Sequence, residues 1–132
     1  MTRREDWLHQ MWSTIEAHKD QPFAWGSNDC CSFSAKVVDA MCDSNFAEQL
    51  SEKYNDEDSA IRYIVEEGGM QKVISTYLGQ SKVGRAQRGD VVLFEGALGE
   101  TLGICVGNTI ASVNDSGVVY FPRSETICYW TI

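Results

Sequence analysis

One cysteine of this 132-residue chain stands where a helix is expected to begin, a position that suits a reactive thiol. Ser27 and Asn28 are good N-cap residues, so a helix is expected from there to about Met41, with Cys30 in its first turn and on its core-facing stripe. The positive end of the helix dipole favours the thiolate form of a cysteine placed there. A neighbouring imidazole would complete a nucleophilic site, because it holds the thiolate in an ion pair and later protonates a leaving group.

The chain offers few bases for that thiol. Its only histidines are His9 and His18, both in the expected first helix. His18 is the better candidate base, because it lies near the end of that helix, from which it could swing towards Cys30. Its alternative role is a helix cap, since an imidazolium is favoured at a helix C-terminus. Cys30 has an unreactive alternative too, because a free cysteine on the apolar face of a helix packs as a small hydrophobic residue.

The five cysteines form no recognisable framework. Their number is odd and no CxxC pair occurs, so reduced thiols in a protein made in the cytosol are the simplest interpretation. Adjacent Cys30 and Cys31 are not spaced as zinc ligands, and no metal and no cofactor are predicted. Cys31 is expected to point about 100° away around the helix, and Cys105 and Cys128 are expected in the core. A metal cluster held by several cysteines stays open as a weaker alternative.

The elements that would position these residues change character along the chain. Apolar side chains recur at helical spacing in the first part and predict helices over residues 4–18, 27–41, 58–67 and 70–78, with a short helix in the acidic segment 48–58. Short β-favouring runs follow at residues 91–94, 102–106, 109–113, 118–121 and 127–132. Helices followed by strands indicate an α+β fold, with a helical N-terminal half packed on a small, mostly antiparallel sheet. The length fits a single domain over residues 1–132.

Charge and hydropathy exclude several classes of function. The net charge is −8, and Lys and Arg cluster nowhere beyond Arg3 and Arg4. Nucleic-acid binding is therefore not expected, since it requires a basic stripe that neutralises phosphates. Docking on an anionic membrane is not expected either. No segment approaches the roughly 20 apolar residues of a membrane span, and the charged N-terminus is unlike a signal peptide.

Three short motifs resemble, in order, those of the NlpC-type peptidoglycan peptidases, a branch of the papain-like superfamily. Phe-Ala-Trp-Gly-Ser-Asn-Asp-Cys at residues 23–30 resembles the nucleophile motif, in which an aromatic-Gly segment leads to Asp-Cys at the start of a buried helix. Arg-Gly-Asp-Val-Val-Leu-Phe at 88–94 resembles the family's Gly-Asp strand. Thr-Leu-Gly-Ile-Cys-Val-Gly-Asn at 101–108 resembles the next strand, which ends in Gly-Ile-X-X-Gly. The resemblance implies a papain-like fold with Cys30 in the place of the nucleophile.

The sequence departs from that pattern at the catalytic histidine. In the NlpC-type pattern this histidine stands two residues before the Gly of the Gly-Ile strand, a position that Thr101 occupies here. A hydroxyl does not titrate near neutral pH, so Thr101 cannot replace the base. The family's third polar residue falls near Ala111 and Ser112, neither of which orients an imidazole well. Cys30 is therefore expected to be a degenerate nucleophile.

Two residues before Cys30 have roles that need no catalysis. Asp29 is expected to turn the chain into the helix by accepting backbone N–H bonds. Trp25 is expected to pack over the helix entry, with an aromatic platform for a substrate as the alternative. With Thr101, these two are the predicted binding residues.

The layout, including the loss of the histidine, also resembles a set of small proteins encoded among bacteriophage tail genes. In that set Trp-Gly-X-X-Asp-Cys and Leu-Gly-Ile-Cys-X-Gly recur, as they do here at residues 25–30 and 102–107. The resemblance implies a virion component near the tail tip, or an assembly factor for it, that is made in the host cytoplasm and binds other tail proteins. The alternative is an active thiol hydrolase that cuts peptidoglycan stem peptides during phage entry, with Cys30 as nucleophile and His18 as base.

Overall fold

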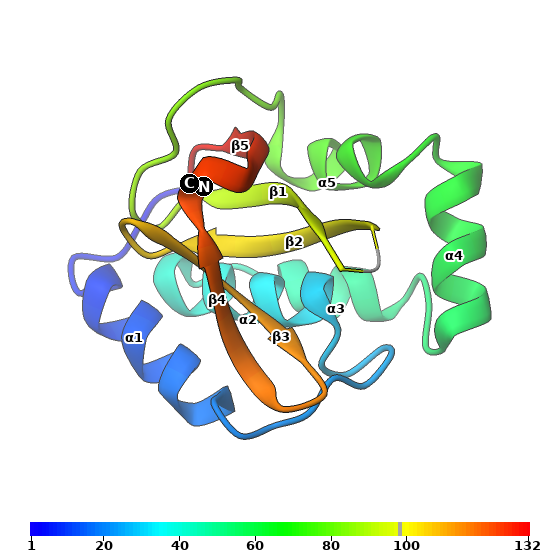
Figure 1. Ribbon diagram of the computed structural model, residues 1–132, viewed down its shortest axis with the longest axis horizontal. Coiled ribbons are helices and arrows are strands. Elements are labelled where there is room, and N and C mark those ends of the chain that lie inside the picture. The colour runs from blue at the N-terminus through cyan, green and yellow to red at the C-terminus, as the bar shows by residue number, and fades with distance from the viewer. Residues whose placement is uncertain (98) are drawn as a thin grey trace.

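The computed structural model describes residues 1–97 and 99–132, and in these residues helices precede strands (Figure 1). The helices are α1 (Trp7–His18), α2 (Cys30–Cys42), α3 (Phe46–Ser51), α4 (Glu57–Glu66) and α5 (Met70–Leu78). The later elements are β1 (Val91–Gly96), β2 (Gly99–Cys105), β3 (Thr109–Asn114), β4 (Gly117–Pro122), a short 3-10 helix η1 (Arg123–Glu125) and β5 (Thr126–Trp130). The predicted α+β fold, helical in its first half, is confirmed.

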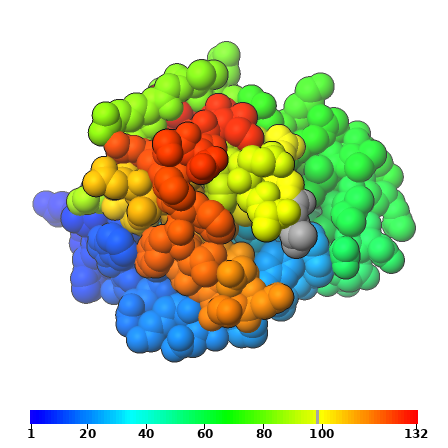
Figure 2. All heavy atoms as spheres, viewed as in Figure 1, coloured from blue at the N-terminus to red at the C-terminus, as the bar shows by residue number. Residues whose placement is uncertain are grey.

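The strands form one five-stranded sheet in the order β4-β3-β2-β1-β5, and all of its strand pairs are antiparallel. Alternate side chains of a strand face opposite sides. One face carries Leu93, Leu102 and Ile104 and packs on the helices in the main core. The other face carries a small cluster around Phe94 and Cys105. Figure 2 looks onto the side where the strand residues, yellow to red, occupy the middle of the surface.

Helix α2 lies behind the sheet and packs against α1, α3 and β2 (Figure 1). It is buried on several sides, with Cys31, Phe33, Val37 and Met41 all in the core. The apolar face predicted for this helix is largely confirmed, since Phe33, Val37, Val38 and Met41 are fully buried; neighbouring elements also cover a further face, which buries Cys31. In the described part of the chain α2, with 13 residues, is the longest helix. No helix there is long and apolar enough to cross a membrane.

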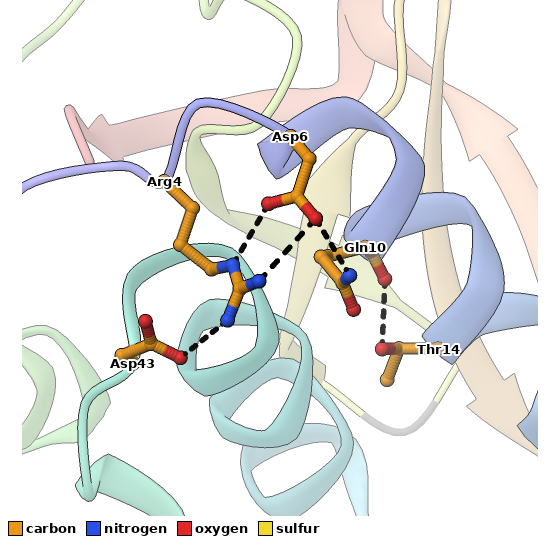
Figure 3. A network of polar contacts seen from close by, with 5 residues as sticks. All are labelled: Arg4, Asp6, Gln10, Thr14 and Asp43. Atoms are coloured by element: carbon orange, nitrogen blue, oxygen red, sulfur yellow. Dashed lines mark hydrogen bonds and ion pairs between the residues drawn. The ribbon is translucent and has the colours of Figure 1, made fainter.

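Side-chain contacts of two arginines, rather than helical hydrogen bonds, hold the N-terminal segment in place. α1 begins at Trp7, three residues after the predicted start. Arg4 donates from Nε to Asp6 and from an Nη atom to Asp43, each at 2.8 Å, and so joins the start of α1 to the end of α2 (Figure 3). Arg3 donates to the carbonyl of Ile132 at 2.7 Å and pairs with Asp90 at 3.2 Å. These contacts keep residues 3 and 4 out of the helix.

Candidate functional site

The loop that leads into α2 is organised by the carboxylate of Asp29. This residue is 2% exposed, and its side chain accepts hydrogen bonds from the backbone N–H groups of Gly26 and Ser32, each at 2.9 Å. The Ser32 hydroxyl accepts in turn from the backbone N–H of Asp29 at 2.8 Å, which completes a capping box. The prediction that Asp29 accepts backbone N–H bonds at the helix entry is confirmed. The prediction of Ser27 and Asn28 as caps was wrong, since Asp29 is the N-cap.

A residue from the α3–α4 connection completes the surroundings of that carboxylate. The Tyr54 hydroxyl donates to both Asp29 oxygens, at 2.9 and 3.0 Å. Burial raises the pKa of Tyr54 above its usual value, and nearby Cys31 and Asp29 raise it further, so the hydroxyl stays a donor at neutral pH. Sequence analysis missed Tyr54, because no local pattern marks a contact across 25 residues.

Trp25 and Gly26 shape the outer side of the same loop. The Trp25 ring packs edge to face on Phe23, with ring centroids 5.0 Å apart, and remains 38% exposed. Gly26 has φ +85°, and a Cβ at this position would lie 2.8 Å from the carbonyl oxygen of Asn55. Trp25 therefore packs on Phe23 at the entrance to α2, where more than a third of its surface is open to contact with a partner or a ligand.

The Cys30 thiol lies against its chain neighbour Cys31 and the backbone of Leu102 in β2. A hydrogen bond from the Cys31 thiol lowers the pKa of Cys30 below its ordinary value of 9.0; burial opposes this effect, and a backbone hydrogen bond from Leu102 adds to it. The same thiol–thiol contact and burial raise the pKa of Cys31. Cys30 is thus the thiol of this pair that ionises first.

The exposure of the two cysteines differs from the prediction. Cys30, expected on the core-facing stripe, is only partly buried, whereas Cys31, expected about 100° away around the helix, is the buried one of the two. The Cys31 sulfur lies 3.4 Å from the thioether sulfur of Met70, at the start of α5. The reason is that Met70 packs against the side of α2 on which Cys31 lies. Met70 was predicted only as the beginning of a helix, and its proximity to the cysteines was missed.

Thr101 and Cys30 lie on different sides of the sheet. Residues directly opposite each other in an antiparallel ladder share a face. Thr101 pairs with Phe94, on the face away from the helices, whereas Leu102, which contacts Cys30, pairs with Leu93 on the helix face. The Thr101 hydroxyl donates to the carbonyl of Gly99 at 3.0 Å. The structure therefore does not bring Thr101 together with the thiol.

The two histidines have other neighbours. His9 is exposed on α1. The Nδ1 atom of His18 is hydrogen-bonded to the carbonyl oxygen of Thr14 at 2.8 Å. The His18 ring packs edge to face on Phe33, with ring centroids 5.9 Å apart. Phe33 follows Cys30 by one helical turn, so His18 lies near the start of α2. Among the described residues no hydrogen bond joins His18 to Cys30.

Ser112 lies near the position of the third polar residue in the NlpC-type pattern, and here it hydrogen-bonds to β2 instead of orienting an imidazole. Ser112 is fully buried in β3, and its hydroxyl donates to the carbonyl of Leu102 at 2.8 Å. Ala111 lies in the main core. Ser112 thus fixes the strand residue whose backbone hydrogen-bonds to Cys30.

A hollow of about 410 Å³ opens beside Met70, lined by the start of α5 and by Glu100 of β2. Met70, one of its lining residues, also contacts the Cys31 sulfur. Within residues 1–97 and 99–132, no three His, Cys, Asp or Glu side chains come together as metal ligands. The arrangement therefore offers a polarised thiol pair and a recess next to it, without an imidazole partner among the contacts described.

Comparison with known proteins gives one match over nearly the whole chain. A family model described as "Domain of unknown function (DUF6950)" matches residues 2–132. No curated protein matches the chain.

Proposed function

We propose that this chain, which belongs to the DUF6950 family, is a binding module that uses a papain-like fold without a peptidase's catalytic pair. Its place of action in this proposal is the tail tip of a bacteriophage, as a virion component or an assembly factor that binds other tail proteins. The α+β order, with a cysteine at the start of the central helix and an antiparallel sheet behind it, supports the papain-like part. The tail context is supported by the sequence motifs around Cys30 and Gly103.

The observation that carries the proposal is the position of Thr101. A thiol peptidase needs a base within hydrogen-bond reach of its nucleophile. Here the strand residue in the histidine's place lies on the same face of the sheet as Phe94, and the groups that lower the pKa of Cys30 are Cys31 and the backbone of Leu102. A fold shared with peptidases does not carry their chemistry unless these groups meet.

Complementation of a phage that carries this gene tests the proposal. In a deletion strain, the Cys30→Ala protein should restore infectious particles to within a few fold of wild type, and so should Cys42→Ala, a matched control at a half-buried cysteine of the same helix. If the protein is a virion component, mass spectrometry should find it in the tails of purified particles. If it is an assembly factor, mass spectrometry should find it only in assembly intermediates. The proposal would be overturned if Cys30→Ala, but not Cys42→Ala, gave particles that have normal tails and do not infect.

One observation favours an active thiol hydrolase as the second candidate. The pKa of Cys30 is lowered by the Cys31 thiol, which shifts the balance towards the thiolate form, and His18 lies against Phe33, one turn after Cys30. This function requires turnover of peptidoglycan stem peptides that is lost in both Cys30→Ala and His18→Ala. Turnover that survives either substitution, or none with the wild type, rejects it.

A further inference from the structure

A hollow of about 480 Å³ lies where three connecting segments of the chain meet, away from the cysteines. The segment between α5 and β1 contributes Arg85, and the turn between β2 and β3 contributes Asn108. The segment from η1 to the start of β5 contributes Arg123, Ser124 and Thr126. Its volume lies in the range of about 300–1,000 Å³ that is typical of small-molecule sites.

The two arginines that line this hollow bring positive charge without a counter-charge. Among residues 1–97 and 99–132, the cations of the ion pairs are Arg3, Arg4 and Lys19. Arg85 and Arg123 therefore form no ion pair in the described part of the chain. The lining residues include no Asp or Glu, so the hollow itself supplies no carboxylate to either guanidinium.

A third arginine adds to the positive charge from beside the β2–β3 turn. The Nε atom of Arg88 donates to the carbonyl of Val106 at 3.2 Å, and an Nη atom lies 3.2 Å from the position of a Cβ at Gly107. The protein as a whole carries a net charge of −8. Salt screens exposed charges beyond about 8 Å at physiological ionic strength. The nearby arginines, rather than distant carboxylates, therefore set the local potential, and this potential attracts an anion.

Backbone contacts fix the positions from which the two guanidinium groups extend. The Arg123 N–H donates to the carbonyl of Asn108 at 3.0 Å, and the Arg123 carbonyl accepts from the Thr126 hydroxyl at 2.6 Å. Ala86, next to Arg85, is fully buried in the cluster around Phe94. These anchors lower the cost of ordering the site when a ligand binds.

The arginines select the kind of anion. One guanidinium satisfies both oxygens of a carboxylate through a pair of parallel hydrogen bonds. Two guanidinium groups on one hollow offer more donors than a carboxylate can accept, whereas a phosphoryl group has three terminal oxygens and up to two charges. A phosphoryl group therefore uses both Arg85 and Arg123.

The remaining polar groups and the volume indicate that the ligand is larger than a free anion. Inorganic phosphate is only a few times the size of a water molecule of about 30 Å³, so it would fill a small part of the hollow. The Thr126 hydroxyl gives its proton to the Arg123 carbonyl and can only accept from a ligand. Ser124 and Asn108 can donate as well as accept. Hydroxyl groups on the ligand would complement these side chains.

We propose that this hollow binds a small phosphorylated polyol or sugar, with its phosphoryl group on Arg85 and Arg123. The hydroxyl groups of the ligand then contact Asn108, Ser124 and Thr126. The site does not depend on the proposed function as a tail protein, and either can fail without the other.

An amide NMR titration of the full chain with glycerol phosphate is the first test. Addition should shift the amide signals of Asn108 and Ser124. Arg85→Gln and Arg123→Gln should each weaken binding at least about tenfold, because each removes charge-assisted hydrogen bonds to the phosphoryl group. Arg62→Gln, at an exposed arginine of α4, is the matched control and should bind as the wild type does. Equal affinity in the wild type and in the double Arg85→Gln, Arg123→Gln variant, or no shift with any of them, overturns the site.

The spectra also show whether each variant is folded. If Arg123→Gln unfolds, Arg85→Gln still decides the outcome, since Arg85 is exposed. Arg123→Lys keeps the charge and loses the planar pair of donors, so it too should bind more weakly. An Arg123→Lys variant that binds as tightly as the wild type would reduce the effect to attraction by charge and refute a built site.

Three further ligands separate the parts of the proposal. Inorganic phosphate should shift the same signals as glycerol phosphate but bind more weakly, and glycerol should not bind. Ser124→Ala should weaken the binding of glycerol phosphate and leave that of inorganic phosphate unchanged. Citrate that binds more tightly than glycerol phosphate would assign the hollow to carboxylates and refute the phosphoryl ligand.

Discussion

The hydroxyl of Tyr54 lies 2.9 Å from one carboxylate oxygen of Asp29 and 3.0 Å from the other, although the two residues are 25 positions apart. This contact joins the α3–α4 connection to the cap of α2. The helix that carries Cys30 and Cys31 is therefore anchored from outside its own sequence.

Removal of the Tyr54 hydroxyl should destabilise the protein. In Tyr54→Phe the buried carboxylate of Asp29 loses a donor, and a hydrogen bond to a charged group contributes about 1.5–3 kcal/mol. Urea denaturation measures the change in the free energy of unfolding. Tyr120→Phe is the control, since Tyr120 is 51% exposed. Equal stabilities of the two variants would show that the Tyr54 contact contributes nothing.

Gly26→Ala should cost more stability than Gly79→Ala. Both glycines have a left-handed φ, +85° and +86°, but a Cβ at Gly26 would meet the Asn55 backbone at 2.8 Å, whereas at Gly79 it would meet nothing within 4 Å. Steric crowding that forces backbone shifts typically adds about 1–3 kcal/mol. Thermal unfolding of the pair separates this contribution from the strain of φ itself, and a Gly79→Ala variant that is the less stable one would contradict the packing described.

Placing the histidine of the NlpC-type pattern at position 101 should not create a peptidase site. In Thr101→His the imidazole would start from the face of the sheet that carries Phe94, away from Leu102 and the Cys30 thiol. We expect no turnover of muropeptides and no change in the alkylation rate of Cys30. A burst of hydrolysis that also requires Cys30 would mean that the strand presents residue 101 to the thiol.

The pH dependence of Cys30 alkylation should reveal its partner. The Cys31 thiol lowers the pKa of Cys30, so labelling should reach half its maximum rate below the ordinary value of 9.0. In Cys31→Ala the donor is lost and the midpoint should move to higher pH; in Cys42→Ala it should stay. Iodoacetamide labelling read by mass spectrometry gives both midpoints, and a midpoint insensitive to Cys31→Ala would exclude the thiol pair as the cause.

The linkage to stability follows from the direction of that shift. An acid whose pKa is lower in the folded state adds stability above its unfolded pKa, and this contribution is lost as the pH falls through the folded value. For Cys30 the contribution is therefore full above its ordinary pKa of 9.0 and is lost as the pH falls through the lowered folded value.

Local signals in the sequence were sufficient for much of the fold. Gly69 and Gly79 flank a segment whose apolar residues recur at helical spacing, and α5 occupies residues 70–78 as predicted. The order of helices and strands followed from the change in periodicity near residue 79. The start of α1 was missed because Arg3 and Arg4 make contacts with distant residues, which no propensity encodes.

The candidate site could be predicted only in part. Cys30 and Asp29 were identified because the cap and first turn of a helix lie within a few residues of each other. Met70 and Tyr54 reach them from other elements, so their proximity depends on packing. The face on which Thr101 lies depends on strand register, and a shift of one residue would have reversed it.

The contact between Arg3 and the carbonyl of Ile132 brings the two chain ends together, side by side in Figure 1. A short linker could close the chain into a ring, and new ends could then be opened in the exposed stretch around Val83 without cutting the sheet. For the same reason the domain can be carried as an insert, since a loop of another protein could enter and leave it at one point. Such a domain would add its surface to a larger assembly without separating the parts on either side.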